Sequence, residues 1–153
     1  TRHGLDPPVQ VLSCWGFGPD DIWAVGASGA ILHWDGTAWT SVGSPTAEAL
    51  WNVWGASPDD VWAVGEAGVL LHWDGGAWSR AASRVDIWLG SVRGTSASDV
   101  WVGGAQGVLL HWDGVAWTFP YSGTGTAISW VWQRRPDELW LLGYDGNMLR
   151  RVE

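Results

Sequence analysis

The sequence predicts an all-β protein made of four copies of one short unit, and three observations lead to this prediction. One phrase recurs as DIWAVGASGAILHWDGTAW, DVWAVGEAGVLLHWDGGAW and DVWVGGAQGVLLHWDGVAW. A fourth, more divergent copy reads ELWLLGYDGNMLRRVE. The first tryptophans of the four copies, Trp23, Trp62, Trp101 and Trp140, follow one another at intervals of 39 residues (62 − 23, 101 − 62 and 140 − 101). Runs of about five apolar residues, many of them β-branched or aromatic, alternate with glycine turns and show no helical period.

Each unit is expected to contain four short strands. In the second unit these are residues 50–55, 61–65 and 69–73, with a fourth strand starting near Trp78. Pro58 and Asp59 indicate the first turn, because proline presets the backbone and aspartate binds turn amides. Gly68 suits a tight second turn, and the pair Asp74-Gly75 is a strong hairpin signal.

Four-stranded units repeated near every 40 residues are typical of the blades of a β-propeller. The blades are expected at residues 10–43, 49–82, 88–120 and 127–153, the last completed by residues 1–4. Thr1 is in phase with Thr40 and Thr118, so Thr1 to Gly4 are expected to form the rim strand beside residues 147–151. Three alternatives remain: an open β-solenoid, part of a larger propeller, and a ring completed by oligomerisation.

The chain is rich in tryptophan, with 16 in 153 residues. Such rings can fill the wedge-shaped gaps between radially splayed sheets. Most of them are therefore expected in the core, and 13 occupy repeated positions: Trp15/54/132, Trp23/62/101/140, Trp34/73/112 and Trp39/78/117.

Composition excludes several classes of function. The chain has 16 acidic and 8 basic residues, a formal charge of −8, and no lysine. This balance argues against nucleic acid or an anionic membrane surface as a partner. No apolar run is long enough to span a membrane, so membrane insertion is not expected. Cys14 is the sole cysteine, which excludes an internal disulfide and a cysteine-based metal site.

Repeated polar residues are interpreted as structural. His33, His72 and His111 recur in phase on third strands, too far apart to share a metal, and are expected to hydrogen-bond a neighbouring blade or turn. Asp35, Asp74 and Asp113 are expected to cap their own hairpins. The adjacent acidic pairs 20–21 and 59–60 lack the alternating ligands of a calcium loop. No metal and no cofactor are therefore expected.

The segment GVLLHWDGGAW and its copies resemble the Asp-box hairpin of sialidase-type propellers, although Asp-Gly-x-x-Trp is one residue tighter than the usual box. The longer phrase VWAVGxxGxxLHWDGxxW is similar to repeats of the photosystem II assembly-factor family and of related bacterial surface propellers. The resemblance implies a propeller fold, a bacterial origin and a secreted or cell-surface location. In the Asp-box family the aspartate is structural, so the resemblance implies no catalytic role for it.

An enzyme is not expected. Sialidase chemistry would need a spaced arginine cluster and a Tyr/Glu nucleophile pair, whereas this chain has arginine doublets at 134–135 and 150–151. Its only tyrosines are Tyr121 and Tyr144. No residue is predicted to be catalytic, and a glycosidase is a remote alternative.

Residues that depart from the repeat are the candidates for ligand binding, because symmetric packing does not require them. Trp51, Trp88 and Trp130 fall where one blade crosses to the next, near one mouth of the expected axial channel. Aromatic platforms with polar neighbours suit a carbohydrate or an extended peptide. The predicted function is a non-catalytic binding module, lectin-like or protein-recognising. The predicted site is Trp51, Trp88, Trp130, Asn52, Arg84, Asp86 and Tyr121.

Two alternatives to a binding module stay open. In the first, the unrepeated tryptophans only fill the wide central axis of a small ring. In the second, the repeats form a structural or oligomerisation scaffold.

Overall fold

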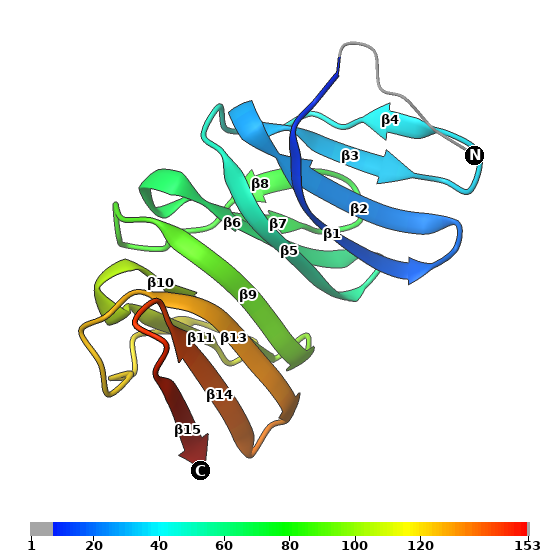
Figure 1. Cartoon of the computed structure of the whole chain (residues 1–153). Coiled ribbons are helices and arrows are strands. Elements are labelled where there is room, and N and C mark those ends of the chain that lie inside the picture. The colour runs from blue at the N-terminus through cyan, green and yellow to red at the C-terminus, as the bar shows by residue number, and fades with distance from the viewer. Residues whose placement is uncertain (1–7, 153) are drawn as a thin grey trace.

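The computed structural model describes residues 8–152 and shows four successive antiparallel sheets (Figure 1). We call these sheets blades 1 to 4. Blades 1 to 3 have four strands each, and the described part of blade 4 has three. The strands are β1 (Val11–Gly18), β2 (Asp21–Gly26), β3 (Ile31–Trp34), β4 (Trp39–Ser41), β5 (Leu50–Ser57), β6 (Asp60–Gly65), β7 (Leu70–Trp73), β8 (Trp78–Arg80), β9 (Leu89–Ser96), β10 (Asp99–Gly104), β11 (Leu109–Trp112), β12 (Trp117–Thr118), β13 (Ile128–Arg135), β14 (Glu138–Gly143) and β15 (Met148–Val152).

The expected strand order within a unit is confirmed. In blade 2, Trp62 on β6 pairs with Trp54 on β5 and with His72 on β7, and Trp73 pairs with Trp78 on β8. One turn of 3₁₀ helix joins the second and third strands of blades 1 to 3: η1 (Ala27–Gly29), η2 (Glu66–Gly68) and η3 (Ala105–Gly107). The last residue of each is a glycine with positive φ, as the sequence predicts for this turn.

The hairpin aspartates cap their own turns, as predicted. Asp35 Oδ1 accepts hydrogen bonds from the Thr37 and Ala38 backbone N–H groups and from Thr37 Oγ1, at 2.7–2.8 Å. These bonds stabilise the charged carboxylate and lower the pKa of Asp35 to about 2, with the Thr37 hydroxyl the largest cause. Backbone donors likewise lower the pKa of Asp74 and Asp113. Each aspartate therefore stays ionised and holds its hairpin closed.

The core lies between the blades, and the tryptophans form its joints. Trp23 of blade 1 lies 4.9 Å from Trp73 and 5.4 Å from Trp78 of blade 2, measured between ring centroids. Trp62 of blade 2 meets Trp112 and Trp117 of blade 3 at 5.7 and 5.1 Å. The same joint is thus built twice, which explains the 39-residue interval between the rings involved.

The blades form an open arc. Their first strands, β1, β5, β9 and β13, lie side by side in order, and the sheets splay outward from them (Figure 1). Blade 1 and blade 4 lie at opposite ends of the array and share no sheet in the described residues. Thr1 to Gly4, expected to complete the last blade, lie outside those residues. The described part of the chain is therefore an arc of a propeller, because the splay between four blades turns through only part of a circle.

Candidate functional site

One mouth of the arc is built on a repeated backbone contact. The residue before the first strand of each blade accepts a hydrogen bond from the first backbone N–H of the turn that follows the second strand of the same blade. Two examples are Ala105 N to Trp88 O at 2.9 Å and Tyr144 N to Ala127 O at 3.0 Å. Blades 1 and 2 make the same bond. The mouth therefore has a regular backbone frame, on which the side chains differ from blade to blade.

Glycine permits this close approach. A Cβ atom added to Gly104 would lie 2.3 Å from Trp88 O, and one added to Gly65 would lie 2.2 Å from Ala49 O. A real side chain at either position would therefore push the neighbouring strand away. The linkers are also fixed, since Ser83 Oγ donates a 2.6 Å bond to Gly68 O and Ile87 O accepts a 2.8 Å bond from Gly68 N.

Three aromatic side chains from three blades meet on this frame. We call Trp51, Trp88 and Tyr144 the mouth cluster. The Trp88 ring lies edge-on to Trp51 at 6.5 Å and tilted against Tyr144 at 5.8 Å. Trp51 is 39% exposed and Tyr144 is 70% exposed, whereas Trp88 is half-buried between them. The cluster therefore presents two accessible rings, Trp51 and Tyr144, with the half-buried Trp88 ring in contact with both.

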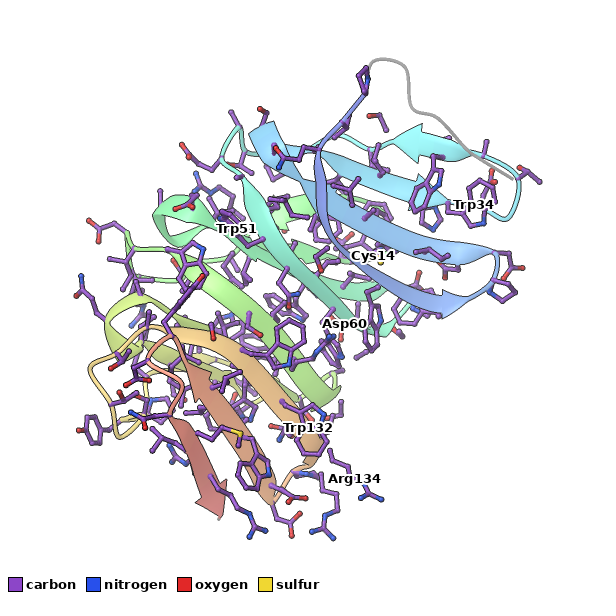
Figure 2. The ribbon with its side chains drawn as sticks, viewed as in Figure 1. Cys14, Trp34, Trp51, Asp60, Trp132 and Arg134 are labelled. Carbon is purple, nitrogen blue, oxygen red and sulfur yellow. The ribbon has the colours of Figure 1, made fainter. Side chains whose placement is uncertain are left out.

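Local contacts hold these rings in place. Trp51 Nε1 donates a 2.8 Å hydrogen bond to Glu66 Oε1, which satisfies the indole N–H and places a carboxylate at the cluster. The Trp88 ring folds over Gly90, where an added Cβ would lie only 2.1 Å from Trp88 Cη2. Figure 2 shows Trp51 beside the start of β5, at the end of the sheets where the linkers cross.

Tyr144 is the one member of this cluster that is not among the predicted site residues. Its counterparts in the other blades are Ala27, Glu66 and Ala105, so it departs from the repeat as clearly as Trp51 does. A comparison of the second turn across the four units would have found it.

The structure separates Trp130 and Asn52 from the mouth cluster. Trp130 lies on β13, with the Arg93 guanidinium 5.3 Å from its ring centroid and 5.1 Å from that of Trp15. Burial between these rings lowers the pKa of Arg93. Asn52 is 4% exposed and joins three blades, since Nδ2 donates to Ser13 Oγ at 3.1 Å and Oδ1 accepts from Val92 N at 3.0 Å.

The other three predicted residues lie on linkers at different places. Arg84 has a φ of 57° and lines a groove of about 580 Å³ between blades 2 and 3, together with Trp62 and Trp117. Tyr121 is 83% exposed and lines a second hollow, of about 470 Å³, beside β15. Asp86 is exposed on the linker that leads to Trp88. Of the seven predicted residues, the structure brings Trp51 and Trp88 into direct contact.

The repeated histidines form one structural unit per blade. In blade 2, His72 Nε2 lies 2.7 Å from Asp60 Oδ1 and the imidazole stacks on Trp62 at 4.1 Å. Blades 1 and 3 repeat the pair at 2.8 and 2.9 Å. The partner is thus the aspartate that begins the second strand of the same blade. Within residues 8–152, no group of three or more His, Cys, Asp or Glu side chains is placed to hold a metal ion.

The helices described within residues 8–152 are single turns, and none is long and apolar enough to cross a membrane.

Comparison with known proteins identifies the fold. The chain is similar to YCF48 bound to D1 peptide, with a TM-score of 0.76, 20% identity, and coverage of 95% of this chain and 51% of that one. It is similar to the WD40 β-propeller domain of Doa1, with a TM-score of 0.76, 11% identity and coverage of 92% and 49%. The designed protein Ika4 has a TM-score of 0.76, 12% identity and coverage of 94% and 91%.

The chain has a β-propeller fold. At these identities the likeness shows the fold alone, and the chain spans about half the length of the YCF48 and Doa1 chains. No family model matches the sequence, and no curated protein matches it. The propeller part of the predicted resemblance is confirmed, whereas the Asp-box relationship stays a prediction.

Proposed function

We propose that this chain is a non-catalytic protein-recognition module that binds an extended peptide or a protein loop at the mouth cluster. The observation that carries the proposal is the meeting of Trp51, Trp88 and Tyr144, three unrepeated aromatic residues from three blades, at one mouth. Large aromatic side chains in supported positions dominate binding energy at protein interfaces. The repeat does not need these rings for its own packing, because alanine, glycine or serine occupies most of the equivalent positions.

The surroundings of the cluster define the expected ligand. Glu66 lies against Trp51, and the Asp145 carboxylate follows Tyr144, with its pKa lowered chiefly by the Asn147 backbone N–H. The chain also carries a formal charge of −8. A ligand with an apolar or aromatic anchor flanked by lysine or arginine would match both features.

The backbone frame supports binding because the mouth needs little further ordering when a ligand binds. The glycines that open each second turn and the linker bonds to Gly68 keep the mouth fixed before a ligand arrives. Pre-organisation of this kind lowers the entropic cost of association.

A lectin-like function is the second candidate, supported by the exposure of Trp51 and Tyr144, because sugar rings stack on accessible aromatic side chains. The interplanar angles of 77° between Trp51 and Trp88 and 58° between Trp88 and Tyr144 give no flat shelf across the cluster. This geometry favours separate side-chain anchors on a peptide over a row of sugar rings.

The test compares an array of random-sequence peptides with a glycan array, both probed with labelled protein. Enriched peptides carrying an apolar anchor and basic residues are expected. Against the best peptide, Trp88→Ala is expected to weaken binding by about tenfold or more, because an aromatic residue at the centre of an interface contributes on the order of 2 kcal/mol. Val115→Ala is the matched control, since Val115 is 84% exposed on the β11–β12 hairpin.

Circular dichroism would first establish that both variants are folded. Equal binding by the Trp88→Ala and Val115→Ala proteins would contradict the proposal. Selective binding to glycans that Trp88→Ala abolishes would instead establish the lectin-like alternative.

A further inference from the structure

In the described part of the chain, the outer side of blade 4 is an exposed, largely apolar surface. We call Trp130, Trp132, Leu142 and Met148, with Trp140 beside them, the blade 4 end face. Their exposed fractions are 41% for Trp130, 44% for Trp132, 38% for Leu142 and 67% for Met148. Together they line a hollow of about 540 Å³. Figure 2 shows Trp132 at the edge of the molecule.

The equivalent positions inside the arc are buried in contacts between blades. In blade 2, Trp54 is 4% exposed, and Val64 and Leu70 are both 0% exposed. These three residues are in phase with Trp132, Leu142 and Met148, each 78 residues (2 × 39) earlier in the chain. The blade 4 end face therefore has the composition of a contact between blades, and no other sheet formed by residues 8–152 covers it.

The opposite side of blade 1 carries the matching surface. We call Val11, Cys14, Ile22 and Trp39 the blade 1 end face. Val11 is 44% exposed and Cys14 is exposed, and Ile22 is partly exposed. The blade 2 counterparts of these three, Leu50, Val53 and Val61, are all 0% exposed because they face blade 1.

The two end faces are complementary by the same repeat that joins the inner blades. At the inner joints, Trp23 meets Trp78 edge-on at 81° and Trp62 meets Trp117 edge-on at 84°. Trp140 on the blade 4 end face is in phase with Trp62. Trp39 on the blade 1 end face is in phase with Trp117. Each end face thus holds one half of the joint.

We propose that two copies of this chain join end to end, with blade 4 of each packed on blade 1 of the other, and close one eight-bladed ring. The arc matches 49% of the length of the Doa1 WD40 β-propeller chain with a TM-score of 0.76, so two such arcs correspond to about one complete propeller. A head-to-tail contact that closes after two copies has two-fold symmetry and leaves no free end. Closure also covers the open sheet face that each copy otherwise exposes.

This inference is independent of the proposed ligand site, because the mouth cluster and the two end faces share no residue. Either proposal can therefore fail without the other.

The test measures the mass of the 153-residue chain by sedimentation equilibrium. A dimer of twice 16.6 kDa is expected. Met148→Glu and Cys14→Arg place a charge in opposite end faces, and each is expected to weaken dimerisation by about 100-fold or more, because an unpaired charge is costly to bury. Both positions are exposed within one copy, so the fold of the single chain is expected to survive. Val115→Glu is the matched control.

Mixing the two variants identifies which faces meet. In a mixed dimer both substitutions fall in the same interface and the second interface is unaltered, so an equimolar mixture is expected to recover dimers that neither variant forms alone. The single thiol gives a second readout, because Cys14 is expected to react with a thiol reagent more slowly in the dimer.

Several outcomes would overturn the proposal. A wild-type chain that stays monomeric up to about 100 µM lacks even a weak interface. Growth into longer polymers would show that the contact does not close. A dimer unaffected by Cys14→Arg would join two blade 4 faces, and no ring would form.

Discussion

Blade 2 and blade 4 carry nearly the same pattern but have different environments. Blade 2 packs on both faces, and its residues Val64, Leu70 and Leu71 are all 0% exposed. Among the described residues, blade 4 packs on blade 3 alone, through residues such as Ile128 and Val131, which are also 0% exposed. Its other face presents Leu142 and Met148 to solvent. An apolar residue in this fold is therefore buried only where a neighbouring blade packs against it, whatever its position within its own blade.

The largest expected effect compares Leu70→Ala with Met148→Ala, two equivalent positions. Leu70 is fully buried between blades, so Leu70→Ala is expected to lower the free energy of unfolding by about 2–5 kcal/mol. Met148 is 67% exposed, so Met148→Ala is expected to change it by less than about 0.5 kcal/mol. Urea denaturation of dilute, monomeric protein would measure the free energy of unfolding of both variants. Equal losses in the two variants would contradict the different environments of blades 2 and 4.

A second pair of substitutions, at Gly68 and Gly146, tests whether the linker after an inner blade constrains the turn before the third strand. A Cβ on Gly68 would lie 1.8 Å from Val85 O, whereas nothing lies within 4 Å of a Cβ on Gly146, its blade 4 equivalent. Both glycines have positive φ, at 67° and 80°, so alanine is strained at either position. Gly146→Ala is expected to lower the free energy of unfolding by about 1 kcal/mol because of its positive φ alone. Gly68→Ala is expected to lower it by more than about 2 kcal/mol, because the added Cβ also collides with Val85 O.

Thermal unfolding of the two glycine variants gives this comparison directly. A Gly68→Ala protein as stable as the Gly146→Ala protein would mean that the linker does not constrain the turn.

The smallest expected effect concerns the hairpin aspartates of blades 1 to 3, which have Val152 as their blade 4 counterpart. The pKa of Asp35 is lowered from 3.8 to about 2 in the folded chain. A carboxylate with a depressed pKa stabilises the fold above its unfolded pKa, and this contribution disappears as pH falls through the folded value. Asp35→Asn is therefore expected to flatten the loss of stability between about pH 4 and pH 2.

Denaturant titrations of wild type and Asp35→Asn across that pH range provide the measurement. Parallel pH profiles for the two proteins would show that the Thr37 and Ala38 bonds to Asp35 do not contribute.

Much of the fold could be predicted from the repeat. The strands near Leu50, Val61 and Trp78, the turn at Gly68 and the hairpin at Asp74 all lie within a few residues of the expected positions. These strands and turns could be predicted because turn residues and apolar β runs act locally. Each signal also recurs in several units at a constant interval, which strengthens the assignment. The hairpin role of Asp35 was predictable for the same reason.

The candidate site was only partly predictable. Departure from the repeat selected Trp51 and Trp88, which meet, but also Asn52, whose side chain spans blades 1 to 3. Sequence phase specifies which strand a residue occupies, whereas contact with another blade depends on how the sheets splay. Tyr144 shows the same limit, because its contact with Trp88 crosses from blade 4 to blade 3.

By itself, the sequence determined the unit: four β-rich repeats of constant length, with tryptophans at the joints and glycine and aspartate in the turns. Only the tertiary structure decided that the described blades form an open arc, that three unrepeated rings meet at one mouth, and that blade 4 keeps an apolar face uncovered. The physical reason is that strands and turns follow from neighbours in the chain. Curvature and contacts between blades follow instead from packing angles summed over many side chains.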